Sequence, residues 1–229
     1  MRRKCMLIIS SALILCASVL ALGEVSKAVP NGIYSDTVII IDAGHGEFDG
    51  GAVAPDGTLE KDINLQIATK LKRMMITNGY RVVMTRTTDS GTDYSETTDI
   101  KSRKTKDMKN RLKLMNTTDN AIFVSIHLNK FEAGSAKGAQ VFYSPKTEGS
   151  KELGESIQKS IVSLTQPENT RQIKSGTKNT YLLYYAQKPA VIVECGFLSN
   201  NEELQLLKND DYQSKIAFAV SLGILDYLS

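Results

Sequence analysis

The sequence has few residues that could cross-link it. Of its 229 residues only three are cysteines, and Cys5 and Cys16 both fall in an apolar N-terminal run. Cys195 alone is left in the rest of the chain, so no disulfide can form within that part. The fold must therefore be held by its hydrophobic core, and by a metal ion if one binds.

The chain also lacks excess charge outside its N-terminus. Residues 1–23 contain three of the 28 basic residues and no acidic ones, which leaves 25 basic against 25 acidic residues. A neutral domain gives no electrostatic reason to expect nucleic acid or an anionic membrane as a partner. We accordingly expect the basic stretch 101–113 to be the solvated face of a helix.

The N-terminal segment has the pattern of a secretory signal. Arg2, Arg3 and Lys4 precede an apolar run that ends in the small-x-small step Ala21-Leu22-Gly23. We expect residues 1–23 to be removed after export across the membrane, leaving a short lead-in over 24–36. The run approaches the roughly 20 apolar residues of a membrane span, so an uncleaved anchor is the alternative. Such an anchor would be the chain's only contact with a membrane.

Strand-like and helix-like segments alternate along residues 37–229, and no repeat or linker divides them. Apolar, β-branched runs predict strands at 37–41, 81–85, 121–126, 139–143 and 190–193. Helical spacing of apolar residues predicts helices at 63–74 and around 112–115, 153–161 and 212–228. The polar segments 87–100 and 165–180 are expected to be loops. The pattern predicts a single α/β domain, with a mostly parallel, doubly wound sheet and helices on both faces.

Histidine is scarce as well, and both copies follow predicted strands. His45 lies in Asp42-Ala43-Gly44-His45-Gly46 and His127 in Ser125-Ile126-His127-Leu128-Asn129, while Glu194 follows a third strand. Ligands bind at the carboxyl ends of strands in open α/β sheets, so these side chains can meet if the strand order makes their strands neighbours. The alternatives are a turn residue at His45 and a hydrogen-bonded core residue at His127.

A zinc site is the chemistry that these residues favour. Imidazole suits zinc, and catalytic zinc usually takes three protein ligands and a water molecule. Glu60 is our candidate for the third ligand, although no His-Glu-x-x-His helix is present and an acid favoured by the helix dipole is the alternative. Glu194 follows Val191-Ile192-Val193, and a carboxylate desolvated there is costly unless it is paired, protonated or near a metal.

Cys195 offers a rival interpretation, because a cysteine together with histidines can act as a nucleophile. Its side chain should point to the opposite face of the strand from that of Glu194. A small buried core residue is therefore the preferred interpretation.

Four blocks of this sequence resemble the zinc-dependent N-acetylmuramoyl-L-alanine amidases of amidase type 3. The blocks are Ile40 to Gly46, Glu60 to Leu65, Ser125 to Asn129 and Pro189 to Asn200, within a likeness that runs from Val38 to Leu228. The resemblance implies that His45, Glu60 and His127 bind one zinc ion and that Glu194 is the catalytic carboxylate. It also implies a groove for a peptidoglycan stem peptide, with Asn129 nearby.

One block departs from the family pattern. The segment Glu47-Phe48-Asp49-Gly50-Gly51 differs from the family, which usually has glycine at position 47 and proline at position 50. The shape of this loop is therefore expected to differ from that of the family, whereas metal binding is not affected. Arg86, at the end of the second predicted strand, is a candidate contact for a stem-peptide carboxylate. A structural ion pair with Asp89 or another acid is the alternative.

A catalytic domain with a signal and no wall-binding repeats looks most like the amidases of endospore-forming bacteria. The resemblance implies hydrolysis of the bond between N-acetylmuramic acid and L-alanine in spore cortex, in preparation for muramic lactam formation and germination. Vegetative wall remodelling, or another zinc amide hydrolase acting on peptidoglycan, is the alternative. Segments 87–100 and 131–138 cannot form an apolar helix that plugs the groove, so control is expected from outside the domain, for example by a separate activator protein.

Overall fold

The computed structural model describes residues 35–92, 99–132 and 134–229. The expected signal over 1–23 and most of the lead-in over 24–36 lie outside these residues. No helix in the described part of the chain is long and apolar enough to cross a membrane.

A single six-stranded sheet forms the centre of the domain, with the strand order β2-β1-β3-β6-β4-β5. Its strands are β1 (Ser35–Ala43), β2 (Tyr80–Met84), β3 (Ala121–Asn129), β4 (Gln140–Tyr143), β5 (Lys174–Ser175) and β6 (Ala190–Phe197). Every neighbouring pair is parallel except β4 with β6. The predicted mostly parallel sheet is confirmed, and β1, β3 and β6 are consecutive strands whose carboxyl ends lie at one edge.

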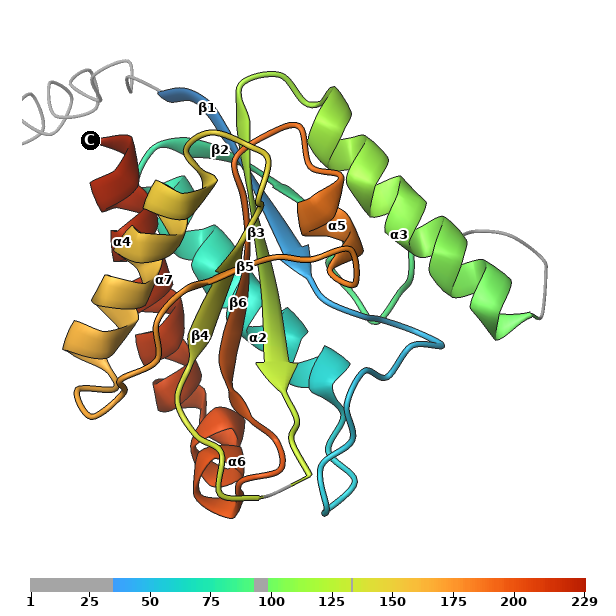
Figure 1. Cartoon of the computed structure of the whole chain (residues 1–229), viewed down its shortest axis with the longest axis vertical. Helices are drawn as coiled ribbons and strands as arrows, with labels where there is room; N and C mark the ends of the chain where they lie inside the picture. Colours follow the sequence, from blue (N-terminus) through green and yellow to red (C-terminus); the bar gives the residue numbers. More distant parts are fainter. Residues whose placement is uncertain (1–34, 93–98, 133) are drawn as a thin grey trace, which may run out of the picture. The chain divides into compact units, whose positions relative to one another are not determined.

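Helices cover both faces of this sheet, as Figure 1 shows. They are α2 (Glu60–Thr77), α3 (Ile100–Thr117), α4 (Ser150–Leu164), α5 (Tyr181–Tyr184), α6 (Asn201–Lys208) and α7 (Asp210–Leu228). One large hydrophobic cluster joins the sheet to α2, α4 and α7, and a smaller cluster joins it to α3 and α5. In β1, Ile39 and Ile41 enter the large cluster and Ile40 the smaller one. Burial on both faces explains why the strand sequences are continuously apolar.

Short elements and one helix face differ from the prediction. β5 has two residues and α5 four, too few to give a periodic signal, and α6 was also not predicted. The prediction that the basic stretch 101–113 is the solvated face of a helix is confirmed for Lys106 and Lys109, which are exposed. The prediction is wrong for Arg111, whose side chain is only 2 % exposed because it forms ion pairs with Asp42 and Asp107. Of the predicted loop 87–100, Ile100 is the first residue of α3, and no other described residue of 87–100 or of 131–138 is helical.

Candidate metal centre

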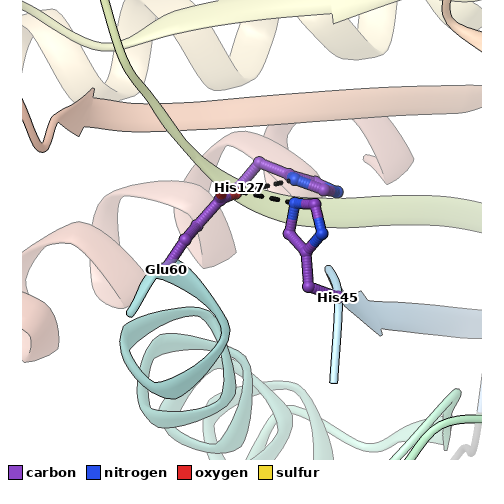
Figure 2. A group of neighbouring side chains, drawn as sticks. All are labelled: His45, Glu60 and His127. Carbon is purple, nitrogen blue, oxygen red and sulfur yellow. Dashed lines mark hydrogen bonds and ion pairs between the residues drawn. The ribbon is translucent and has the colours of Figure 1, made fainter. Parts of the chain in front are cut away.

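The strand order brings both histidines to Glu60. His45 lies just beyond β1 and His127 near the end of β3, and these strands are parallel neighbours. Glu60 is the first residue of α2. One ligand atom from each of the three side chains lies within 4.8 Å of the other two. Figure 2 shows the carboxylate and the two rings pointing toward one another from three separate elements.

The carboxylate of Glu60 contacts both imidazole rings. Its Oε2 lies 3.2 Å from His45 Nε2, and its Oε1 lies 2.9 Å from His127 Nδ1. The backbone N–H groups of Ala52 and Leu128 donate to the same carboxylate, at 2.8 and 3.0 Å. These buried contacts fix the direction in which the carboxylate faces the rings.

Two glycines allow the three side chains to approach so closely. A Cβ atom on Gly44 would lie 2.3 Å from the ring of His127. A Cβ atom on Gly51, where φ is +70°, would lie 2.6 Å from Glu60 Oε2 and 2.7 Å from His45 Cδ2. Any side chain at either position would displace one of the three residues.

The loop after β1 holds His45 in an uncommon backbone conformation. His45 has a φ of 62° and Glu47 a φ of 49°, and a residue with a Cβ atom pays roughly 1–2 kcal/mol in this region. Gly46 and Asp49 exchange two backbone hydrogen bonds of 2.9 Å, which close the loop. Asp49 Oδ2 also lies 2.9 Å from His45 Nδ1. When Nδ1 donates this hydrogen bond, the lone pair of Nε2 is left facing Glu60 and is free to bind a metal.

The charges of the centre fit a cation. Burial alone would lower the pKa of His45, but the hydrogen bonds and charges of Asp49 and Glu60 outweigh burial and raise this pKa to about 9. Burial would raise the pKa of Glu60, but His127 and His45 hold it far below its ordinary value. The site therefore stabilises positive charge between these residues. Two imidazole nitrogens and one carboxylate oxygen are a donor set that suits zinc and leaves room for a further ligand.

Glu194 faces the same centre from β6. It is the register partner of His127 and, with both histidines, lines a pocket of about 240 Å³. Its Oε2 atom is buried and has no hydrogen-bond partner among the described residues. Burial raises the pKa of this carboxyl to about 7, although the charge of His127 opposes the rise. A carboxyl that titrates near neutrality is suited to accepting and returning a proton.

Arg111 on α3 supports the backbone that leads to His45. Its guanidinium donates to the carbonyls of Ala43 and His45 at 3.0 and 2.8 Å. It also forms ion pairs with Asp42 and, at 2.7 Å, with Asp107. A planar group with several fixed donors can hold two carbonyls and two carboxylates at once.

Arg86 supports the same loop from the other side. Its Nε donates to the carbonyl of Ala43 at 2.8 Å, and its Nη2 to those of Gly44 and Lys61 at 3.0 and 2.7 Å. The side chain is buried, and Asp89 forms its ion pair with Lys61, at 2.5 Å. The structure thus places Arg86 behind the loop and does not bring it together with the pocket around Glu194.

Asn129 is the last residue of β3, two positions beyond His127. Its carbonyl accepts a hydrogen bond from Leu198 at 2.8 Å and it is the register partner of Phe197. The half-buried side chain makes no hydrogen bond within the described chain. Its amide group therefore keeps its hydrogen-bonding capacity at the carboxyl edge of the sheet.

Cys195 lies in the large hydrophobic cluster, on the opposite face of β6 from Glu194. The side chain is fully buried, and burial raises the pKa of the thiol well above its ordinary value. A buried, protonated thiol is not a nucleophile, so the prediction of a core residue is confirmed.

Sequence reasoning did not identify Asp49 or Arg111 as parts of the site. Asp49 follows His45 by four residues, and a carboxylate near a ligand histidine is a signal that could have been used. Arg111 lies in a stretch of basic residues that all look alike in the sequence, and only the fold distinguishes it from its exposed neighbours.

Comparison with known proteins shows the family of this chain. A family model described as N-acetylmuramoyl-L-alanine amidase matches residues 39–226. The germination-specific N-acetylmuramoyl-L-alanine amidase of Bacillus subtilis is 35% identical over 195 residues, which cover 85% of this chain and 81% of that protein.

Solved structures show the same relationship. The CwlD amidase from Clostridioides difficile, solved in complex with the GerS lipoprotein, is 41% identical, with a TM-score of 0.81 over 83% of this chain and 98% of the other. An N-acetylmuramoyl-L-alanine amidase from Clostridium difficile 630 is 34% identical, with a TM-score of 0.72 over 84% and 96% of the two chains. The chain therefore belongs to the N-acetylmuramoyl-L-alanine amidases, the peptidoglycan hydrolases that cut between muramic acid and the stem peptide.

Proposed function

We propose that this amidase works with one zinc ion held by His45, Glu60 and His127, and that Glu194 is its catalytic carboxylate. The observation that carries the proposal is the convergence of three side chains able to bind a metal, beside a carboxylate with one buried oxygen that has no partner among the described residues. Zinc bound by such a set supplies Lewis acidity, which polarises the scissile carbonyl and makes water a stronger acid.

The residues of the chain would handle the protons and the orientation of the groups. Glu194 accepts a proton from the attacking water and returns it to the leaving amine of L-alanine as the amide bond breaks. Asp49 holds His45 in the tautomer that leaves Nε2 unprotonated. In the metal-free protein burial raises the pKa of Glu194 to about 7, and a bound cation would lower it toward the ionised form that accepts the proton.

The substrate would enter along the open side of the pocket. Residues of α3 and α5 form its walls, among them Met108, Tyr181 and Leu182. We propose that the Asn129 side chain contacts the stem peptide, since Asn129 follows His127 by two residues at the end of β3 and its half-buried side chain makes no hydrogen bond within the described chain. For Arg86 we propose a positioning role, because its donors already bind the loop that carries His45.

The spore cortex is the proposed location of the substrate. A germination-specific amidase of B. subtilis is similar over most of both chains, which supports a role in preparing cortex for muramic lactam formation. Cell-wall amidases act outside the cytoplasm, so we propose that residues 1–23 direct export toward the forespore intermembrane space. The similarity to an amidase solved with a lipoprotein supports a separate protein partner as its activator.

Muropeptide analysis of spores tests the location. Spores of a strain without this protein should lack muramic lactam and keep stem peptides on those muramic acids, and the Glu194→Gln variant should not restore the lactam. Normal lactam content together with an altered vegetative wall would instead assign the enzyme to vegetative remodelling. Metal analysis of the purified protein tests zinc, with close to one ion per chain expected.

A further inference from the structure

The loop 45–51, here called the ligand loop, is fastened to α3 by two side chains that are not candidate metal ligands. Arg103 and Lys104 are consecutive residues of α3. Each forms an ion pair with a different acid of the ligand loop. The two contacts reach the loop independently of the backbone hydrogen bonds that Arg111 makes to Ala43 and His45.

Arg103 contacts two residues of the ligand loop, Glu47 and Phe48. Its Nη2 lies 2.9 Å from Glu47 Oε1, and its guanidinium lies 4.0 Å from the centre of the Phe48 ring. Glu47 has a φ of 49°, a conformation that glycine adopts more readily. The Glu47 side chain makes the turn harder to form, and its ion pair with Arg103 offsets part of that cost.

Lys104 reaches a metal-ligand candidate through a single intermediate. Its Nζ lies 2.8 Å from Asp49 Oδ1, while Asp49 Oδ2 lies 2.9 Å from His45 Nδ1. The carboxylate of Asp49 is thus held from both sides. A carboxylate on the second nitrogen of a ligand histidine sets the ring orientation, so whatever fixes Asp49 also fixes His45.

We propose that Arg103 and Lys104 are positioning residues for the metal centre, and that α3 sets the zinc affinity of the ligand loop through them. The proposal rests on the proposed function, since it requires that His45 bind zinc. Part of the zinc affinity then lies in the contact between a helix and a loop, and not in the three ligands alone.

Zinc titration against a competing chelator tests this with variants that leave the ligands intact. Arg103→Gln and Lys104→Gln should each raise the zinc dissociation constant about threefold to tenfold, since partly exposed ion pairs and cation–π contacts are individually modest. Lys106→Gln is the matched control: it removes the same charge from an exposed position of α3 and should leave the affinity unchanged.

A double-mutant cycle of Glu47 and Arg103 tests whether their ion pair is the contact that affects zinc affinity. Glu47→Gln should weaken zinc binding, and adding Arg103→Gln should then have a smaller effect than it has alone, because both changes break the same ion pair and the contact with Phe48 is still lost. Arg103→Lys should give an intermediate affinity, since lysine keeps the charge but not the planar group over Phe48. Urea unfolding of the metal-free variants shows whether each still folds.

The outcomes separate this proposal from the function on which it rests. If the wild type binds zinc and the variants fold but bind it with unchanged affinity, the contact with α3 is only structural and the proposal is wrong. If Lys106→Gln weakens binding as much as the other variants, general charge is responsible and the proposal is also wrong. If the wild type binds no zinc, the metal centre itself fails.

Discussion

His127 and Glu194 are register partners across β3 and β6, so a metal-ligand candidate and a carboxylate of raised pKa lie side by side at the carboxyl edge of the sheet. Directly opposed residues of neighbouring strands share one face, which sets both side chains toward the same pocket. The two roles proposed for them, metal binding and proton transfer, can nevertheless be separated by substitution.

Glu194→Gln should keep zinc close to one ion per chain while lowering turnover by at least about a hundredfold. The amide keeps the size of the side chain but cannot accept the proton, and a general base contributes roughly 10²–10⁴. Turnover and metal content are to be measured on the same preparation. Full activity in this variant would remove Glu194 from the reaction.

His45→Ala and His127→Ala should lose zinc itself. Two remaining ligands hold the ion poorly, and the buried carboxylate of Glu60 would lose one of its two ring contacts in either variant. Elemental analysis after dialysis is the readout. Undiminished occupancy in either variant would exclude that histidine from the ligand set.

The contribution of Glu194 to the stability of the metal-free protein should become unfavourable as pH rises through the titration of this carboxyl. Below pH 4.5 the carboxyl is protonated in both the folded and unfolded states; between 4.5 and about 7 only the unfolded state ionises, which favours unfolding. Above about pH 7 the carboxyl is ionised in both states and the loss of stability is complete. The difference between the pKa values of 4.5 and about 7, at about 1.4 kcal/mol per pH unit, corresponds to about 3 kcal/mol in the free energy of unfolding.

Glu194→Gln removes this penalty, so the variant should gain stability over the wild type as pH rises from 4.5 to 8. Urea unfolding in the presence of a chelator, at several pH values, measures the difference. A difference that does not change with pH would show that burial does not raise the pKa of Glu194.

The buried pair of Arg111 and Asp42 should dominate the stability of the ligand loop. Arg111→Met leaves the fully buried Asp42 without its main cation and should cost about 3–5 kcal/mol at pH 7. The double variant with Asp42→Asn should recover part of that loss, because the fully buried carboxylate is then neutral and only Asp107 still lacks its ion pair. Equal losses in the single and double variants would argue against the ion pair as the cause.

Much of the fold could be predicted because its strands are buried on both faces. The continuous apolar runs at 37–41 and 121–126 identify β1 and β3, and the spacing of Ile63, Ile67 and Leu71 identifies α2. The antiparallel direction of β4 could not be predicted, since an apolar run carries no information about the direction of its neighbour.

The residues that carry chemistry were easier to find than those that support them. The histidines and Glu194 stand out because they follow apolar strands, whereas their convergence needed the strand order. Arg111 and Arg86 act through burial and through bonds to distant backbone carbonyls, which the sequence does not encode locally.

The central claim is that this chain uses zinc to cut the bond between N-acetylmuramic acid and L-alanine, and the products of purified peptidoglycan test it most directly. Mass spectrometry of a digest by the zinc-loaded protein should show intact stem peptides with L-alanine at their free amino end, alongside glycan strands without those stems. A chelator should abolish these products, and added zinc should restore them. Deacetylated sugars, peptides cut within the stem, or the same products in the presence of chelator would contradict the account.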